Sequence, residues 1–237
     1  MELIKNGAVF VSDAHENGFN RYLFAKFLDK MEQNPPPQLF LMGDMFDFLS
    51  KTCFTQKVFQ SYIQRLNTLG KRCEIYYFEG NHDFNLRQIF PQIKVFSLSQ
   101  QPAVFSSEFG EEFSLAHGDV FLPFFQQTAL KMLRARWLVW ALDLVDCALF
   151  YAISRAILRK QKSKNMGFKI QNFKELISRK IDRYKTKRVC EGHYHQGESV
   201  EFGEKNYFNF AAFGIEGEFY IASFKQKKLI FIKQNLT

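Results

Sequence analysis

The sequence predicts an α/β fold from two observations. Short apolar runs of strand length alternate with helical patterns in the first third of the chain. Five such runs along the chain end in a cluster of acidic, amide or imidazole side chains. Alternating strands and helices are typical of α/β proteins, in which ligands gather at the carboxyl ends of the strands. We therefore expect the polar clusters to meet in one crevice.

Five buried strands are predicted from the apolar runs. The runs stand in the segments "GAVFVSDAH", "QLFLMGDMFD", "EIYYFEGNHD", "EFSLAHGD" and "KRVCEGHYH". Helices are predicted over 20–33 and 56–70, and the proline cluster at 34–38 is read as a connector. After residue 196, apolar alternation with Gly and Asn turns predicts antiparallel strands that close the sheet system.

The length of 237 residues predicts one domain over 1–237, with a helical insert at 120–185 that breaks near 164–167. The insert contains 14 Lys or Arg but only 4 Asp or Glu, so it carries the positive charge of a chain whose formal net charge is +8. An apolar stripe packed on the core is the commoner use of such helices. The alternative is a lid with an apolar pocket for acyl chains and a cationic rim for a bilayer.

The cysteines and the apolar segments of the sequence indicate which cellular compartment the protein occupies. The four cysteines form no C-x-x-C pair, which favours reduced cytosolic thiols, and the first ten residues lack a secretory pattern. The apolar stretch 137–153 contains Asp143 and Asp146 and is shorter than the roughly 20 residues of a spanning helix. We expect no membrane span, whereas contact with a membrane surface stays open.

The distribution of histidine points to metal chemistry. All five histidines of the chain lie in the polar clusters that follow the strands. Asp13 and His15 are two residues apart, so in an extended segment both project to one side, as do His193 and His195. Taken singly, such motifs are usually strand-end caps or turns. Together they offer seven oxygen or nitrogen ligands, enough for two adjacent metals: Asp13, His15, Asp44, Asn81, His117, His193 and His195.

The motifs "SDAH", "GDMFD", "GNHD", "HGD" and "GHYH" occur in an order that resembles the calcineurin-like metallophosphoesterase family, over about 8–120 and 186–225. The resemblance implies a four-layer α/β/β/α sandwich of two sheets flanked by helices. It implies two divalent metal ions, with Mn²⁺ favoured and Mg²⁺, Fe or Zn²⁺ as alternatives. The first metal would be held by Asp13, His15, Asp44 and His195, and the second by Asp44, Asn81, His117 and His193.

The same resemblance implies roles for residues beside the ligands. His82 would face the substrate as phosphate stabiliser or general acid. Asp83 would orient His82, while Asp47 and Asp119 would support the ligand loops.

The position of the insert, between H-G-D and G-H-x-H, resembles that of UDP-2,3-diacylglucosamine pyrophosphohydrolases of lipid A synthesis. The best-known branch has G-N-R-D-F where this chain has "GNHDF", so the resemblance is to a divergent branch. It implies cleavage of the diphosphate of a nucleotide-linked acylated sugar to 2,3-diacylglucosamine 1-phosphate and UMP. It also implies a peripheral place on the cytoplasmic face of the inner membrane, against an anionic surface, with no nucleic acid or protein partner.

Candidate substrate contacts and alternative functions complete the prediction. Arg87 lies close enough after "GNHDF" to reach a diphosphate, and the insert residues Arg155, Arg159 and Lys160 are candidates for phosphate or membrane contact. A metal-dependent nuclease or other phosphodiesterase of the same fold would also use a basic surface. A protein phosphatase is disfavoured because "GDMFDFL" lacks the Arg-Gly pair of that class. A metal-free scaffold is disfavoured because all seven ligands are present.

Overall fold

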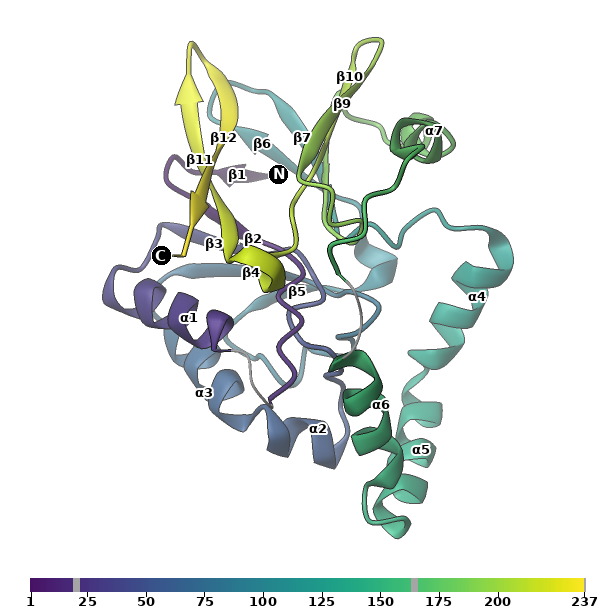
Figure 1. The fold of residues 1–237 in the computed structure, drawn as a ribbon. Helices are drawn as coiled ribbons and strands as arrows, with labels where there is room; N and C mark the ends of the chain where they lie inside the picture. Colours follow the sequence, from purple (N-terminus) through teal and green to yellow (C-terminus); the bar gives the residue numbers. More distant parts are fainter. Residues whose placement is uncertain (19–21, 163–165, 237) are drawn as a thin grey trace.

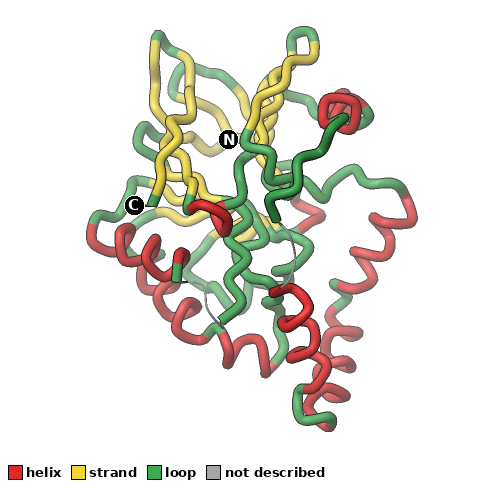
Figure 2. Tube along the Cα trace, viewed as in Figure 1, coloured by secondary structure: helices red, strands yellow, loops and turns green. Residues whose placement is uncertain are grey.

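Two six-stranded sheets form the centre of the computed structural model, which describes residues 1–18, 22–162 and 166–236 (Figures 1 and 2). The first sheet has the order β12 (Lys228–Asn235), β11 (Glu218–Lys225), β2 (Val9–Val11), β3 (Gln38–Leu41), β4 (Glu74–Phe78) and β5 (Lys94–Phe96). The second has the order β1 (Glu2–Ile4), β6 (Ala103–Ser107), β7 (Glu112–Ala116), β8 (Arg188–Glu191), β10 (Lys205–Asn209) and β9 (Glu198–Phe202).

Three hydrophobic clusters define four layers. One cluster joins helices α1 (Leu23–Gln33) and α3 (Gln60–Leu69) to the first sheet. A second cluster, rich in phenylalanine, lies between the sheets, where the rings of Phe10 and Phe40 stack at 4.2 Å. The third joins the second sheet to α7 (Phe173–Ser178) and the 3-10 helix η2 (Ile181–Arg183). The predicted α/β/β/α sandwich is confirmed.

The central strands are buried on both faces, which explains their unbroken apolar runs. Leu39 and Leu41 of β3 pack against the helices, and Phe40 packs against the other sheet. Successive side chains of a strand point to opposite faces, so each central strand serves two clusters.

Strand direction brings the polar clusters to one edge. Strands β2, β3 and β4 are parallel neighbours, as are β7 and β8, and these five correspond to the five predicted strands. Strands β1, β5 and β6 were not predicted. Beyond residue 196, β9–β10 and β11–β12 are antiparallel as expected, but β10 also pairs in parallel with β8.

The helices differ from the predicted ranges in two places. Residues 20 and 21 of the predicted 20–33 helix lie outside the described residues, and α1 is described from Leu23. The pattern over 56–70 corresponds to two helices, α2 (Cys53–Val58) and α3, which meet at the buried Phe59. Because this ring is held in the core, it ends α2 and begins α3 in a non-helical conformation.

The insert forms three main helices, α4 (Phe124–Leu133), α5 (Arg136–Ala148) and α6 (Ala152–Lys162). Of these, α6 lies beside α2, α5 packs on α6, and α4 extends away from α2 (Figure 1). The predicted break near 164–167 falls partly on 163–165, outside the described residues. Among the helices of the described ranges, none is by itself long and apolar enough to cross a membrane, although α5 and α6 together meet the length and composition required and bend by 100° at their junction. The short elements η1 (Leu98–Gln100) and α8 (Phe213–Glu216) complete the fold.

Candidate metal centre

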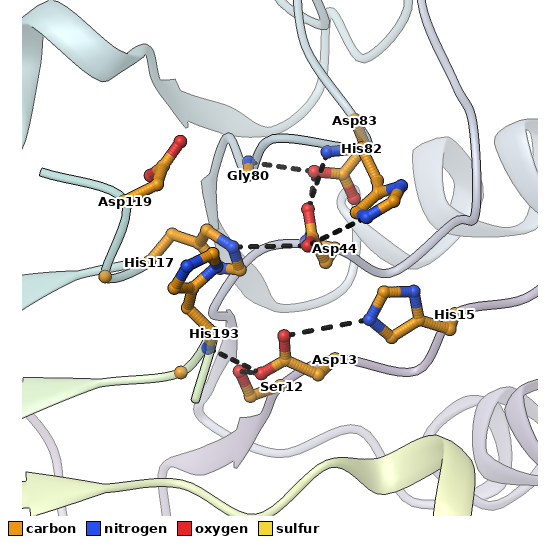
Figure 3. Close-up of polar contacts among 12 residues, drawn as sticks. Ser12, Asp13, His15, Asp44, Gly80, His82, Asp83, His117, Asp119 and His193 are labelled. Atoms are coloured by element: carbon orange, nitrogen blue, oxygen red, sulfur yellow. Dashed lines mark hydrogen bonds and ion pairs between the residues drawn. The ribbon is translucent and has the colours of Figure 1, made fainter. Parts of the chain in front are cut away.

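Loops at the carboxyl ends of five strands bring the predicted ligands together, and Figure 3 shows Asp13, His15, Asp44, His117 and His193 among them. The ligand atoms of Asp13, His15 and His195 lie within 4.8 Å of one another. Those of Asp44, His117 and His193 form a second group within the same limit. The first group holds three of the four ligands predicted for one metal, without Asp44, and the second holds three of the four predicted for the other, without Asn81.

The backbone is strained at these positions. Asp13, His15, Asp44, His193 and His195 all have positive φ, between 48° and 65°. Non-glycine residues rarely adopt this left-handed conformation, and it persists only where the surrounding structure enforces it. Five strained residues in one cluster indicate that the fold holds these side chains in place for a function.

Two glycines of the motifs are required by close approach. A Cβ atom at Gly80 would collide with the carboxylate of Asp44, and one at Gly192 would collide with Ser12 and Asp13. The glycines of "GNHD" and "GHYH" therefore let the ligand loops touch one another.

Each of three histidines has its Nδ1 fixed by an oxygen outside the cluster. The partner of His15 is Oδ1 of Asp47 at 3.0 Å. The partners of His117 and His195 are the carbonyl oxygens of Met42 at 2.9 Å and Met166 at 3.0 Å. A proton on Nδ1 leaves Nε2 as the free lone pair, which is the usual arrangement around metal-binding histidines.

The protonation states of Asp13, Asp44 and His193 suit metal binding. At His117 and His195, by contrast, burial is outweighed before a metal binds, because the carboxylates of Asp44 and Asp13 raise the pKa of these histidines. Burial opposes ionisation of Asp13, but the neighbouring His195 lowers its pKa to about 2, and the pKa of Asp44 is held well below its usual range by His117 and His82 against the effect of burial. Burial and the nearby His117 lower the pKa of His193 to about 4. Ionised carboxylates and a neutral imidazole are the forms that bind metals.

Buried polar atoms that lack a hydrogen-bond partner indicate whether the site can hold metal ions. Within the described part of the chain, Nε2 of His15 and Oδ1 of Asn81 are buried without a hydrogen-bond partner. Nε2 of His117 lies 3.3 Å from Oδ2 of Asp44. Buried polar atoms are normally paired, so these inward-facing atoms fit the ligand set of two cations.

The sequence was compared with those of known protein families to establish the family of this chain. The sequence matches the description "Calcineurin-like phosphoesterase" over residues 8–197. The chain belongs to the calcineurin-like phosphoesterase family. The family implies divalent metals, and the two residue groups above are their candidate sites.

Individual relatives carry the name UDP-2,3-diacylglucosamine hydrolase. One from Coxiella burnetii is 28% identical over 117 residues, which are 47% of this chain and 46% of the relative. The chain thus spans about half the length of that relative. One from Aeromonas hydrophila is 23% identical over 197 residues, 79% of this chain and 81% of the relative.

Solved structures of similar fold include a predicted phosphoesterase from Streptococcus pneumoniae, with a TM-score of 0.46 and 11% identity, covering 98% of this chain and 91% of that one. An archaeal phosphodiesterase has a TM-score of 0.46 and 13% identity, covering 97% and 99%.

His82 lies at the rim of the phosphoesterase site. Its Nε2 is 4.0 Å from Oδ2 of Asp44, and its Nδ1 is 3.0 Å from the carbonyl oxygen of Asp47. Its backbone N–H donates to Oδ1 of Asp44 at 2.8 Å. The side chain is 11% exposed, so the ring has one edge toward the ligands and one toward solvent.

The structure corrects the predicted role of Asp83. Its buried carboxylate accepts hydrogen bonds from the backbone N–H groups of Asp44, Met45 and Gly80 and from the hydroxyl of Tyr77. Both oxygens are thereby committed to the loop that carries Asp44. Asp83 therefore positions a ligand loop, whereas the His82 ring is held by the Asp47 carbonyl oxygen.

Asp47 and Asp119 lie where support of the ligand loops was predicted. Asp47 fixes His15, as described above. The buried Asp119, two residues after His117, accepts a hydrogen bond from Nη2 of Arg134 at 2.7 Å.

Arg134 is a residue that sequence reasoning missed. It follows α4, and its Nη2 also donates to the carbonyl oxygen of Gly80 at 2.7 Å, next to Asn81. Its side chain is 9% exposed, and it ties the insert to the metal centre. The sequence gives no signal for it, because it is one of 14 basic residues in the insert.

An apolar cavity of about 300 Å³, which we call the inner cavity, lies between the insert and the metal centre. The ligand loops contribute Asp47, Phe48, Asn81, His82 and Phe84 to it, and the insert contributes Leu130, Leu133, Arg134, Val139, Leu142, Ile157 and Gln161.

The predicted substrate contacts Arg87, Arg155, Arg159 and Lys160 do not line the inner cavity. Arg155 and Arg159 line a different cavity, together with Phe54 and Val58 of α2, because they occupy the face of α6 opposite Ile157. Lys160 is exposed on the same helix, and Arg87 lines a further cavity described below. For Arg155, Arg159 and Lys160 of α6, we keep contact with a membrane as a proposal.

Proposed function

We propose that this phosphoesterase cleaves the diphosphate of UDP-2,3-diacylglucosamine to 2,3-diacylglucosamine 1-phosphate and UMP. The observation that carries the proposal is the inner cavity, since an apolar space opens directly beside Asn81 and His82. Phosphate chemistry alone needs no such space, whereas a substrate with acyl chains does. The names of the relatives from Coxiella and Aeromonas support the same substrate.

The seven predicted ligands would hold two divalent cations, with manganese as the proposed ion. Metals there would lower the pKa of a bound water and withdraw charge from the phosphoryl oxygens. The chain positions these ligands through the strained loops and the Nδ1 contacts described above. With both metals bound, the site would be an anion-binding centre at the end of the inner cavity that Asn81 and His82 line.

We propose that the side chain of His82 contacts the phosphate group of the substrate. Its Nε2 edge faces the ligand carboxylate of Asp44, and the ring lines the inner cavity. With Nδ1 fixed by the Asp47 carbonyl oxygen, Nε2 is the atom that would donate to a phosphoryl or leaving oxygen.

The test is incubation of the purified protein with Mn²⁺ and UDP-2,3-diacylglucosamine, followed by mass spectrometry for UMP and the lipid 1-phosphate. In H₂¹⁸O, the product that gains the label identifies the phosphorus that is attacked. The Asp44→Asn variant serves as the blank, because it lacks a predicted ligand of both metals.

Turnover of the lipid nucleotide, absent in the blank, supports the proposal. Turnover of single-stranded DNA without turnover of the lipid nucleotide would instead favour a nuclease, with the steep salt dependence of phosphate contacts.

We also propose peripheral contact with an anionic membrane on the cytoplasmic face. Phe124, Phe125 and Phe150 of the insert are 76%, 85% and 80% exposed. The insert also carries exposed basic residues, among them Lys131 of α4 and Arg155 and Arg159 of α6. Apolar side chains beside cations are typical of surfaces that bind anionic lipid. Cosedimentation with phosphatidylglycerol vesicles tests this contact, and loss of binding in Phe150→Asp is expected.

A further inference from the structure

A second cavity, of about 480 Å³, adjoins the insert and is lined by both tryptophans of the chain. We call it the tryptophan cavity. Trp137 and Trp140 are 70% and 65% exposed. They are three residues apart on α5, so they lie on one face of the helix. Two exposed indoles on one wall offer a surface for stacking a planar group.

Three cations face the same cavity. Lys51, Arg87 and Arg136 line it, and within the described ranges none of these side chains forms a hydrogen bond or ion pair. Two acids also line it, but both are engaged. Glu79 is buried and accepts from the N–H of Leu86 at 2.8 Å, and Asp143 accepts from the N–H of Cys53 at 3.1 Å. These hydrogen bonds leave both carboxylates their charge, but burial raises the pKa of Glu79 and three cations still outnumber two acids. The lining of the cavity is therefore net positive, which suits a phosphate.

The tryptophan cavity is linked to the metal centre by a short chain of contacts. Asn85 lines the cavity, and its Nδ2 donates to the carbonyl oxygen of Arg134 at 3.0 Å. Arg134 in turn donates to the carbonyl oxygen of Gly80, next to Asn81. Val139 lines both cavities. The two cavities thus share a wall at Val139, and the tryptophan cavity lies close to the loop that carries Asn81.

We propose that the tryptophan cavity binds a nucleoside phosphate, with the base on the indoles of Trp137 and Trp140 and the phosphate on Arg87 and Arg136. The identification of that ligand as the uridine nucleotide half of the substrate rests on the proposed function. The inner cavity would then take the acyl chains, and the diphosphate would lie at the metal centre beside Asn81 and His82. Base stacking beside a cation is a common way to bind nucleotides without reading their sequence.

A lipid headgroup also presents a phosphate beside an apolar group, so the experiment must separate the two sources. Quenching of intrinsic tryptophan fluorescence reports on this cavity directly, because both tryptophans line it. Titrations with UMP are made in EDTA, so that metal-bound phosphate does not contribute. Uridine, inorganic phosphate and phosphatidylglycerol vesicles are titrated separately.

We expect UMP to quench saturably and more tightly than uridine or phosphate. The double variant Arg87→Gln, Arg136→Gln should weaken UMP binding at least about tenfold, since two charge-assisted contacts are lost. Lys26→Gln, which removes one exposed cation of α1 outside both cavities, should match the unaltered chain. Trp137→Phe should fold, because the side chain of Trp137 is mostly exposed, and should lose part of the fluorescence quenching by UMP.

Equal binding of UMP by the double variant and the unaltered chain would overturn the inference. Quenching by vesicles without quenching by UMP would overturn it as well and assign the tryptophans to a membrane. In either case, hydrolysis of UDP-2,3-diacylglucosamine by the unaltered chain with Mn²⁺ would leave the proposed function standing, so the two failures are distinguishable.

Discussion

The ligand loops and the helices of the insert differ in how firmly the chain fixes their side chains. Asp13 and His117 are fully buried, and their loops have strained or hydrogen-bonded backbones. Helix α4 has no buried residue, and α5 has only Val139 and Asp146. The loops are held by the core itself, whereas the insert leaves much of its apolar surface facing cavities and solvent.

This difference separates two tasks. Substitutions in the ligand loops should damage cleavage of every phosphodiester, because the loops position the metals. Apart from Arg134, which contacts the metal centre, substitutions in the helices of the insert should change the preference for one substrate over another and leave the chemistry intact. Four variants, from the largest expected effect to the smallest, test where that boundary lies.

Asp44→Asn should have the largest effect. Oδ1 of Asp44 accepts from the N–H of His82, Oδ2 faces His117, and Asp44 is the predicted ligand of both metals. We expect bound manganese to fall and activity to drop at least about 10³-fold. Elemental analysis and a hydrolysis assay check both. Asp182→Asn, an exposed acid of the insert, is the matched control, and two metals with full activity in Asp44→Asn would contradict the site.

His82→Ala should abolish most activity and keep the metals. Because His82 is not a predicted ligand, metal content should stay at that of the unaltered chain while turnover falls about 10²- to 10⁴-fold. The loss should be similar for the lipid nucleotide and for bis(p-nitrophenyl) phosphate, since the role is toward phosphate. His82→Arg, which restores a cationic donor, should recover part of the activity. Loss of metal in His82→Ala would mean that the ring is a ligand.

The sequence predicted the metal centre better than its surroundings for a physical reason. Each ligand follows a short buried strand, and the parallel strands of each sheet end at one edge. Because the two sheets pack face to face, Asp13 after β2 and His193 after β8 meet although 180 residues separate them. Strand ends are local features that a sequence displays. The metal identity and the membrane face are not encoded in this way and stay predictions.

Tertiary contacts account for what the sequence did not reveal. Asp83 was expected to orient His82, but its hydrogen bonds to residues 44–46 become visible only when two loops are brought together. The position of Arg134 depends likewise on how α4 meets Gly80. The same is true of α6, whose packed face decides that Ile157, and not Arg155, lines the inner cavity.

Asp47→Ala tests how much one supporting contact within the ligand loops contributes to metal binding. Oδ1 of Asp47 fixes Nδ1 of His15, and loss of such a contact typically lowers metal affinity about 10- to 100-fold. The Asp47 carbonyl oxygen, which holds His82, is unchanged in the variant. Manganese titration should show one weakened site. Asp47→Asn keeps an acceptor oxygen, so its manganese affinity should lie between those of the unaltered chain and Asp47→Ala. Identical manganese affinities in these three proteins would show that His15 does not need the contact with Asp47.

Leu142→Trp should have the smallest effect and the most selective one. Leu142 lines the inner cavity, and an indole there would fill space proposed for an acyl chain. We expect KM for the lipid nucleotide to rise about tenfold, more for longer acyl chains, with hydrolysis of bis(p-nitrophenyl) phosphate unchanged. Leu144→Trp is the control, since Leu144 is on the same helix and similarly exposed, at 54% against 47%, but does not line that cavity. If both variants behave alike, the inner cavity does not hold the acyl chains, and the insert acts on the substrate from another face.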